Sequence, residues 1–315
     1  MIISMVVLIF GFLLLIKGAD WMVEGSATLA KKYNVSDLVI GLTIVAFGTS
    51  APELVVNGFA SIENYPDLVL GNIIGSNNFN LFIILGIVGL ISPIVVKSST
   101  VWKEIPISFL AALILLILGN SFLNDTSVIT RLDGMILILL FAGFLFYIFK
   151  QLKNDLALPA SNFQNISNTK ILLLILGGLA GLIIGGKLVV DSAITIATNL
   201  GLSEKLIGLT ILAAGTSLPE LVTSIMAALK KNSDIAIGNV IGSNIFNILL
   251  IIPISSFINP ISFNTKFNID IYILLFGTLL LFIAMFTGEK KKLDRWEAAL
   301  LLVFYLGYTL FLIFE

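Results

Sequence analysis

The sequence contains neither cysteine nor histidine, and only 12% of its 315 residues are charged. Without cysteine there are no disulfides, no thiolate metal sites and no thiol nucleophile. Without histidine there is no imidazole base and no histidine-ligated zinc. A net charge of −1 gives nucleic acid nothing to bind. A buried site must therefore be built from carboxylate, hydroxyl, amide and backbone carbonyl oxygens, which are hard ligands suited to Na+, Ca2+ or Mg2+.

The scarcity of charge accompanies long apolar stretches, and 58% of the residues are hydrophobic. An apolar run of about 20 residues can cross a bilayer as one helix. We therefore predict an all-α membrane protein with ten transmembrane helices. The predicted spans are 2–24, 37–62, 67–91, 103–120, 132–150, 170–190, 204–229, 234–258, 268–287 and 295–314.

The basic residues divide unequally between the connections that join these spans. The connections after odd-numbered spans carry 13 lysines and arginines, and those after even-numbered spans carry three. Positive charge in short loops marks the cytoplasmic side of a membrane. We therefore expect the odd connections in the cytoplasm, with both termini outside a cell membrane that the chain crosses many times.

An internal repeat relates two parts of the chain. Residues 41–81 align without a gap on residues 208–248, at a constant offset of 167, with 22 identities in 41 positions. We predict three segments: a first five-helix repeat at 1–150, a short cytoplasmic linker at 151–169 and a second repeat at 170–315. Because five is odd, the second repeat enters the membrane from the opposite side. Inverted repeats that meet at the bilayer midplane are typical of transporters with alternating access.

The repeated sequence motifs place a proline and a glutamate inside each of the second and seventh spans. Pro52 and Pro219 lack an N–H, so we expect these two helices to kink and to free backbone carbonyls near the midplane. Glu53 and Glu220 are the only acidic residues near the middle of any span. A carboxylate there must be paired, protonated or bound to a cation. The alternatives to a cation site are a structural kink and a carboxyl pair that shares a proton.

Hydroxyl and amide side chains surround the glutamates in sequence. Thr49 and Ser50 precede Glu53 by four and three residues, which places them on its face of a helix. The third span adds a polar stripe with a spacing of four residues, and the eighth span repeats it. The members are Asn72, Ser76 and Asn80, and then Asn239, Ser243 and Asn247. Such a stripe favours cation ligation or, alternatively, hydrogen bonds between helices. Asn72 and Asn239, at the stripe ends, fit the structural role better.

The words GTSAPE and GTSLPE, each followed by GN-x-x-GSN-x-x-N, resemble the two alpha-repeats of the cation/calcium antiporter superfamily. The chain looks like a prokaryotic sodium/calcium exchanger-type member. The resemblance implies that the glutamates and threonines ligate Ca2+, that the serines and kinked-helix carbonyls ligate Na+, and that the asparagines lie at the centre. The implied ligands are Glu53, Glu220, Thr49, Thr216, Ser50, Ser217, Ser76, Ser243, Asn80, Asn247, Ala46 and Ala213.

One departure concerns the central pair. Many family members carry an aspartate at one of the positions matched by Asn80 and Asn247, so this chain keeps only two core carboxylates. That difference leaves the ion stoichiometry open and argues against potassium coupling. The proton-coupled branch of the superfamily has GN-x-x-E motifs in place of GTS-x-PE, so the sequence favours sodium over protons as the coupling ion.

We therefore predict a secondary antiporter that exchanges Ca2+ for Na+ across the cell membrane. The expected partners are these two ions and the lipid bilayer, with no cofactor, nucleic acid or required protein partner. The alternatives are a proton-coupled or other divalent-cation antiporter of the same fold, or a cation channel. An enzyme is not expected, since no histidine can activate Ser50 or Ser217 and no P-loop is present.

Overall fold

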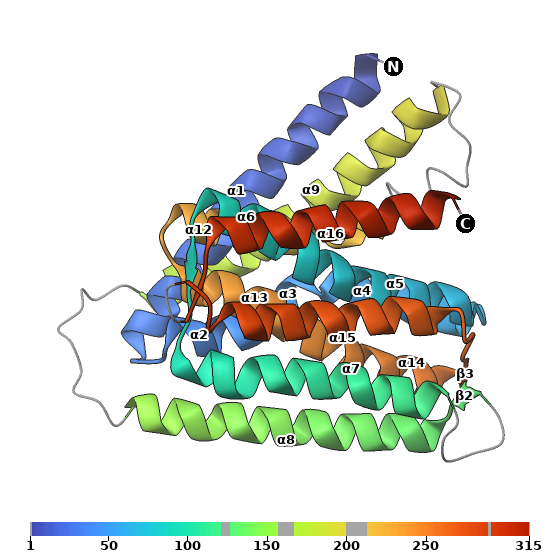
Figure 1. Cartoon of the computed structure of the whole chain (residues 1–315). Helices are drawn as coiled ribbons and strands as arrows, with labels where there is room; N and C mark the ends of the chain where they lie inside the picture. The colour runs from blue at the N-terminus through green and yellow to red at the C-terminus, as the bar shows by residue number, and fades with distance from the viewer. Residues whose placement is uncertain (1, 121–126, 157–166, 200–212, 289–290, 315) are drawn as a thin grey trace.

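The computed structural model describes residues 2–120, 127–156, 167–199, 213–288 and 291–314. These residues form a helical bundle with a few two-residue strands (Figure 1). The first part of the chain contains α1 (Ile2–Lys32), α2 (Asp37–Ile40), α3 (Ala46–Thr49), α4 (Ala51–Ile62), α5 (Pro66–Asn78), α6 (Leu85–Ile91), β1 (Ile94–Val95), α7 (Ile105–Gly119), β2 (Val128–Ile129) and α8 (Arg131–Leu156). The second contains α9 (Asn168–Asn199), α11 (Ala213–Thr216), α12 (Leu218–Leu229), α13 (Ser233–Phe246), α14 (Ile252–Ile258), β3 (Ile261–Ser262), α15 (Phe267–Ala284), β4 (Lys292–Leu293) and α16 (Arg295–Phe314).

Short π-helical segments lie between or before several of these helices. Those among the described residues are Gly41–Val45, Phe79–Ile84, Thr100–Glu104 and Asn247–Ile251. Two of them begin at the predicted polar stripes: Phe79–Ile84 begins one residue before Asn80, and Asn247–Ile251 begins at Asn247. Wider turns of this kind recur at functional sites, because they redirect side chains without ending the helix.

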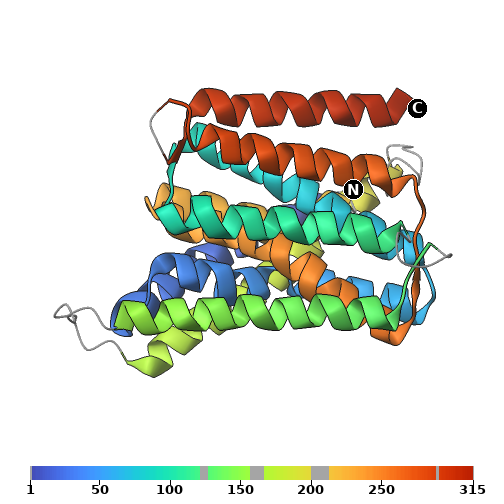
Figure 2. The ribbon, with the colours of Figure 1, turned by 60° about the horizontal axis from the view of Figure 1, so that its bottom comes forward.

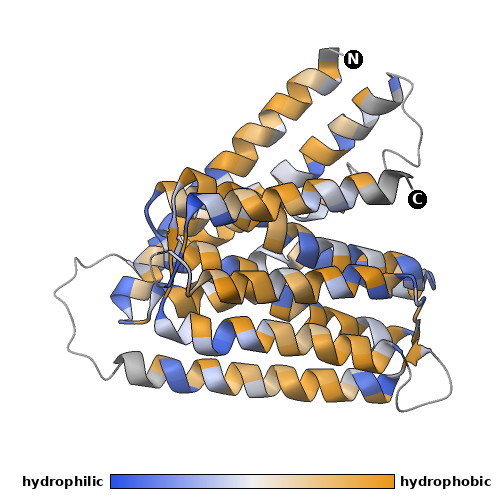
Figure 3. Ribbon diagram, viewed as in Figure 1, coloured by the Kyte–Doolittle hydropathy of each residue, from blue (hydrophilic) through white to orange (hydrophobic). Residues whose placement is uncertain are grey.

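The helices have the length and composition of membrane spans. Within the described ranges, seven helices are long and apolar enough to cross a bilayer, and a bent pair, Asp37–Thr49 with Ala51–Ile62, makes eight. Hydrophobic residues run along the helices, while hydrophilic ones gather at their ends (Figure 3). Residues 204–212 of the predicted seventh span lie outside the described residues, so the ten-span count stays a prediction. Of the predicted linker, 151–156 belong to α8, 168–169 belong to α9, and 157–166 are not described.

The second predicted span is broken, as its proline suggests. The chain turns by 46° between α3 and α4, and the break falls at Ser50, whose φ and ψ are −81° and 6°. Pro52 lies in the first turn of α4, where a missing N–H removes no hydrogen bond. Ser217 has nearly the same backbone angles, −88° and 5°, between α11 and α12, with Pro219 in the first turn of α12.

The buried centre of the bundle is α13 with its extension to Ile258, which is almost entirely enclosed. It packs against α2, α3, α5, α7 and α12. α8 and α16 lie at opposite edges of the bundle (Figure 2). Two small antiparallel strand pairs, β1 with β4 and β2 with β3, each join the first part of the chain to the second. The polar residues that the second repeat places in α13 therefore lie in the most enclosed of the candidate spans among the described residues.

α1 and α9 lie side by side, at a steep angle to long helices such as α7, α8 and α15 (Figure 1). Their backbones meet at glycines. A Cβ atom added at Gly18 would lie 2.8 Å from the carbonyl oxygen of Gly178, and one added at Gly178 would lie 2.6 Å from the backbone nitrogen of Met22. Small residues at such a contact allow the backbone approach that drives helix association in lipid.

This contact predicts that Gly18→Ala destabilises the protein by about 1–3 kcal/mol, because the new methyl group meets backbone atoms, which cannot rotate away. Thermal unfolding of the detergent-purified protein measures the change. Gly143→Ala on α8 is the matched control, since a Cβ there meets nothing within 4 Å. Equal melting temperatures for the two variants would contradict the close backbone contact.

Candidate cation site

The two predicted glutamates lie in equivalent places. Glu53 is in the first turn of α4 and Glu220 is in the first turn of α12, and each side chain is only 1% exposed. Neither carboxylate forms an ion pair with any lysine or arginine of the described residues. Two buried carboxylates without a basic partner are costly in a protein interior.

Serines from both repeats bind one oxygen of each carboxylate. Ser50 Oγ donates to Glu220 Oε1 over 3.0 Å, and Ser76 Oγ donates to Glu53 Oε1 over 3.1 Å. Ser76 Oγ also lies 2.5 Å from Ser217 Oγ, so one of these two hydroxyls donates to the other. The serine of each broken helix thus faces the glutamate of the opposite repeat.

Two longer contacts complete the serine set. Ser217 Oγ lies 3.5 Å from Glu53 Oε1, and Ser243 Oγ lies 3.5 Å from Glu220 Oε1. All four serines are buried, at 3% exposure or less. The structure therefore brings each glutamate together with one serine of either repeat, Glu53 with Ser76 and Ser217, and Glu220 with Ser50 and Ser243.

Four buried oxygens of the predicted ligands have no hydrogen-bond partner within the described structure. They are Glu53 Oε2, Glu220 Oε2, Asn80 Oδ1 and Asn247 Oδ1. A buried acceptor without a donor costs about 1–3 kcal/mol, more when it is charged. The two carboxylate oxygens come from equivalent positions of the two repeats, and so do the two amide oxygens. Oxygens of both kinds are ligands that a hard cation binds.

Two asparagines that the sequence analysis did not include among the ligands, Asn77 and Asn244, form hydrogen bonds with the side-chain amides of Asn80 and Asn247. Asn77 Nδ2 donates to the backbone carbonyl of Asn244 over 3.2 Å, and Asn244 Nδ2 donates to the carbonyl of Asn77 over the same distance. Asn80 Nδ2 donates to Asn244 Oδ1 over 3.0 Å, and Asn247 Nδ2 donates to Asn77 Oδ1 over 2.9 Å. The spacing of four used in the sequence analysis missed this pair, although both lie in the repeated GSN word.

The threonines bind the stripe ends of the opposite repeat. Thr49 Oγ1 donates to Asn239 Oδ1 over 3.0 Å, and Thr216 Oγ1 donates to Asn72 Oδ1 over 3.1 Å. Asn239 Nδ2 also donates to the carbonyl of Glu220 and to Ser224 Oγ. Asn72 and Asn239 thus hydrogen-bond between helices, which is the structural role expected of them.

The alanine carbonyls are less clearly placed at the site. The carbonyl of Ala46 accepts from the backbone N–H of Ser50 over 3.0 Å. It also lies 3.3 Å from Thr49 Oγ1, whose single hydrogen is shared between this carbonyl and Asn239 Oδ1. Ala213 begins α11, at the edge of the described residues, and no contact of its backbone carbonyl is described.

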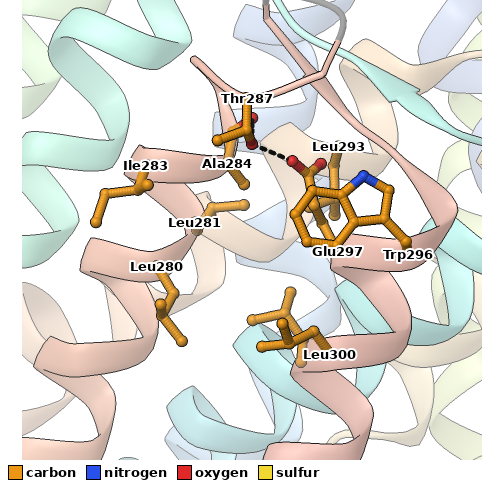
Figure 4. A pocket seen from close by; sticks show the side chains of 10 residues that line it. Leu280, Leu281, Ile283, Ala284, Thr287, Leu293, Trp296, Glu297 and Leu300 are labelled. Carbon is orange, nitrogen blue, oxygen red and sulfur yellow. Dashed lines mark hydrogen bonds between the residues drawn. The ribbon is translucent and has the colours of Figure 1, made fainter.

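A separate cavity lies between the end of α15 and the start of α16. It measures about 90 Å³ and is lined mainly by apolar side chains, beside a hydrogen bond from Thr287 to Glu297 (Figure 4). It contains none of the predicted site residues, so the serine–carboxylate group remains the candidate site.

The chain is similar to known proteins over nearly its whole length. Residues 3–150 and 170–314 match the family described as "Sodium/calcium exchanger protein". The sodium/calcium exchanger MaX1 of Methanosarcina acetivorans is 31% identical, over 99% of both chains. The inner membrane protein YrbG of Escherichia coli is 36% identical, over 82% of this chain and 81% of its own length. A solved structure of the sodium–calcium exchanger NCX_Mj superposes with a TM-score of 0.84 at 34% identity, over 99% of both chains.

The different contacts of the two stripe ends predict unequal losses of stability. Asn239→Leu removes two donated hydrogen bonds and the acceptor of the Thr49 hydroxyl, so we expect a loss of about 1–3 kcal/mol. Asn72→Leu should cost clearly less, because Asn72 Nδ2 already has no partner. Thermal unfolding of both variants in detergent measures the difference. A larger loss of stability for Asn72→Leu than for Asn239→Leu would contradict the hydrogen bonds described for these two side chains.

Proposed function

The chain belongs to the sodium/calcium exchanger protein family, and on that premise we propose that it exchanges Ca2+ for Na+ across a cell membrane. The observation that carries the proposal is the set of four unpartnered oxygens on Glu53, Glu220, Asn80 and Asn247. They are buried, and no basic side chain of the described residues neutralises them. A cation supplies the charge and the contacts that this set lacks.

Charge balance supports exchange of the two ions. The two carboxylates balance one Ca2+ or two Na+, and the serines that touch the same carboxylates supply further neutral oxygens. Ions that share these oxygens exclude one another, so binding of one species releases the other. NCX_Mj, the structural relative, has been soaked with Na+ and Ca2+.

We propose that the two ions cross by alternating access, in a chain of ten spans arranged as two inverted repeats. Contacts related by the offset of 167 support the repeat arrangement. Thr49 with Asn239 matches Thr216 with Asn72, and Ser50 with Glu220 matches Ser217 with Glu53. The distribution of basic residues favours both termini outside the cell. Ca2+ and Na+ are the transported substrates, and the mechanism needs neither a cofactor nor a protein partner.

The proposed ligands differ in what their oxygens contribute. The glutamates supply the only charge, and the four serines supply hydroxyl oxygens that contact the carboxylates. Thr49 and Thr216 supply two further hydroxyl oxygens. Asn80 and Asn247 supply amide oxygens at the contact between the two repeats. The carbonyls of Ala46 and Ala213 are the remaining ligands, and Ala46 must exchange a hydrogen bond for an ion to serve as one.

The proposal predicts Ca2+ uptake into Na+-loaded proteoliposomes diluted into Na+-free buffer. Glu53→Gln and Glu220→Gln should each reduce this uptake by about 100-fold or more, because loss of one member of a buried charged contact costs ~3–5 kcal/mol. Radioactive calcium measures the uptake. Glu24→Gln, at an exposed position of α1, is the control and should transport normally.

Other outcomes identify the alternatives. Uptake driven by a proton gradient and indifferent to Na+ would assign the chain to a proton-coupled antiporter. Steady ionic conductance without a counter-ion requirement would indicate a channel. Normal uptake by both glutamine variants would remove the carboxylates from the transport site.

A further inference from the structure

The orientation of the central amides follows from two backbone carbonyls. A side-chain amide has two similar ends, one an oxygen acceptor and the other an NH2 donor. A backbone carbonyl only accepts, so the end of Asn77 that faces the Asn244 carbonyl must be the NH2 group. The Oδ1 atom of Asn77 is then the end that faces Asn247.

That assignment passes to the next side chain. Asn247 must present its NH2 group to Asn77 Oδ1, at 2.9 Å, so its own oxygen is turned away and left unpartnered. The same chain of reasoning runs from the Asn77 carbonyl through Asn244 to Asn80, at 3.0 Å. Both unpartnered amide oxygens are therefore fixed by side chains that are not themselves ligands.

We propose that Asn77 and Asn244 are positioning residues, which force Asn80 and Asn247 to present oxygen rather than NH2 to the transported cation. The inference rests on the proposed function of the same site. Its importance comes from the absence of an aspartate at the centre. A carboxylate binds a cation through either end, whereas an amide turned the wrong way offers a donor that repels one.

The test is a double-mutant cycle between positions 77 and 247. Asn77→Leu releases Asn247 to turn over, and we expect the KM for Ca2+ in Na+-loaded proteoliposomes to rise about tenfold, the equivalent of ~1.4 kcal/mol. In the Asn247→Asp background, Asn77→Leu should raise KM little or should lower it. Both ends of an aspartate carboxylate are oxygens, so turning it over changes nothing. The substitution at position 77 also removes an amide oxygen that would face, and repel, the new carboxylate.

A merely structural role for Asn77 predicts something different, namely the same penalty in both backgrounds. That additive result, with the native chain active, would overturn the inference while leaving the proposed function intact. Lack of Na+-dependent uptake by the native chain would instead contradict the proposed function. Asn78→Leu is the matched control, because Asn78 is equally buried but donates to the carbonyl of Asp270, away from the amide group; its KM should be unchanged. Asn77→Ala replaces Asn77→Leu in the cycle if the leucine variant does not fold.

An independent observation concerns an ion pair at the edge of the bundle. Asp20 of α1 lies 2.6 Å from Lys230, which follows the last residue of α12, and both side chains are partly buried. Lys17 also contacts Asp20, at 2.9 Å. The repeat offset of 167 relates Asp20 to Lys187 of α9, and Lys230 to Glu63, which follows α4. The equivalent pair is thus also of opposite charge, with the signs reversed.

Only one of the two pairs is formed in the described structure. Glu63 and Lys187 are both exposed, and neither takes part in an ion pair among the described residues. The backbone does not account for the difference, because the residues after Glu63 and Lys230 both adopt a positive φ, 59° and 57°. The difference lies in the neighbouring helix. α1 packs along α12, whereas a cavity of about 310 Å³ lies between α9 and α4, with Lys187 and Val55 in its lining.

We infer that the two ion pairs alternate during the transport cycle. The pair between Asp20 and Lys230 stabilises the described state, and the pair between Lys187 and Glu63 forms when α9 closes onto α4 and α1 leaves α12. The inference rests on the proposed alternating access, and the chemistry of the ions does not enter it.

A single cysteine can report on this equilibrium, because the native chain has none. Val55→Cys in the cavity wall is labelled with a water-soluble maleimide. Asp20→Asn should slow the labelling and Glu63→Gln should speed it, each by about two- to fivefold, since a partly exposed ion pair contributes only ~0.5–1 kcal/mol. Thr265→Cys, in an exposed turn, controls for the labelling chemistry. Shifts in the same direction, or no shift, would overturn this inference. Labelling needs no ion gradient, so this outcome is separate from any failure of Na+/Ca2+ exchange.

Discussion

The structure depends on two carboxylates buried without a basic partner. Glu53 and Glu220 lie in an interior of low dielectric, where an uncompensated charge costs several kcal/mol or more. The protein reduces this cost only in part. Serine hydroxyls bind one oxygen of each carboxylate, and the other oxygen remains without a donor. A site left incomplete in this way has what the proposed exchange requires: a charge that a cation can balance, and oxygens that no hydrogen-bond donor occupies.

Pseudo-symmetry explains why the incomplete site lies where it does. Each repeat contributes a broken helix and a polar helix, and several contacts of the site, among them Ser50 with Glu220, reach across to the other repeat. Thr49 contacts the eighth predicted span and Thr216 contacts the third. The departures from symmetry are also informative. Asn239 has three hydrogen-bond partners where Asn72 has one, and the Asp20–Lys230 pair has no formed counterpart among the described residues. The two halves thus share one backbone arrangement but differ in their side-chain contacts.

The sequence predicts much of this arrangement, for physical reasons that are easy to state. A proline and a glutamate within an apolar run can be read directly, because lipid tolerates neither without a compensating structure. The helix break at Ser50 and the grouping of the glutamates with four serines follow from that argument. The roles of Asn77 and Asn244 do not, since their contacts depend on which residues of two distant helices face each other. Periodicity gives the face of one helix, but not the rotation of its neighbour. The alanine carbonyls illustrate the same limit, because the hydrogen bonds of Ala46 become visible only in the folded backbone.

The glycine contact between α1 and α9 joins the first long helix of one repeat to the first long helix of the other. Because their backbones touch at glycines, the two helices form one tightly packed pair. In the described structure this pair packs against α12, and a cavity lies between α9 and α4. If the pair moves as one body in the alternating access that we propose, it opens one side of the site only by closing the other. The same small residues that let two helices touch would then protect the membrane against a continuous leak of ions.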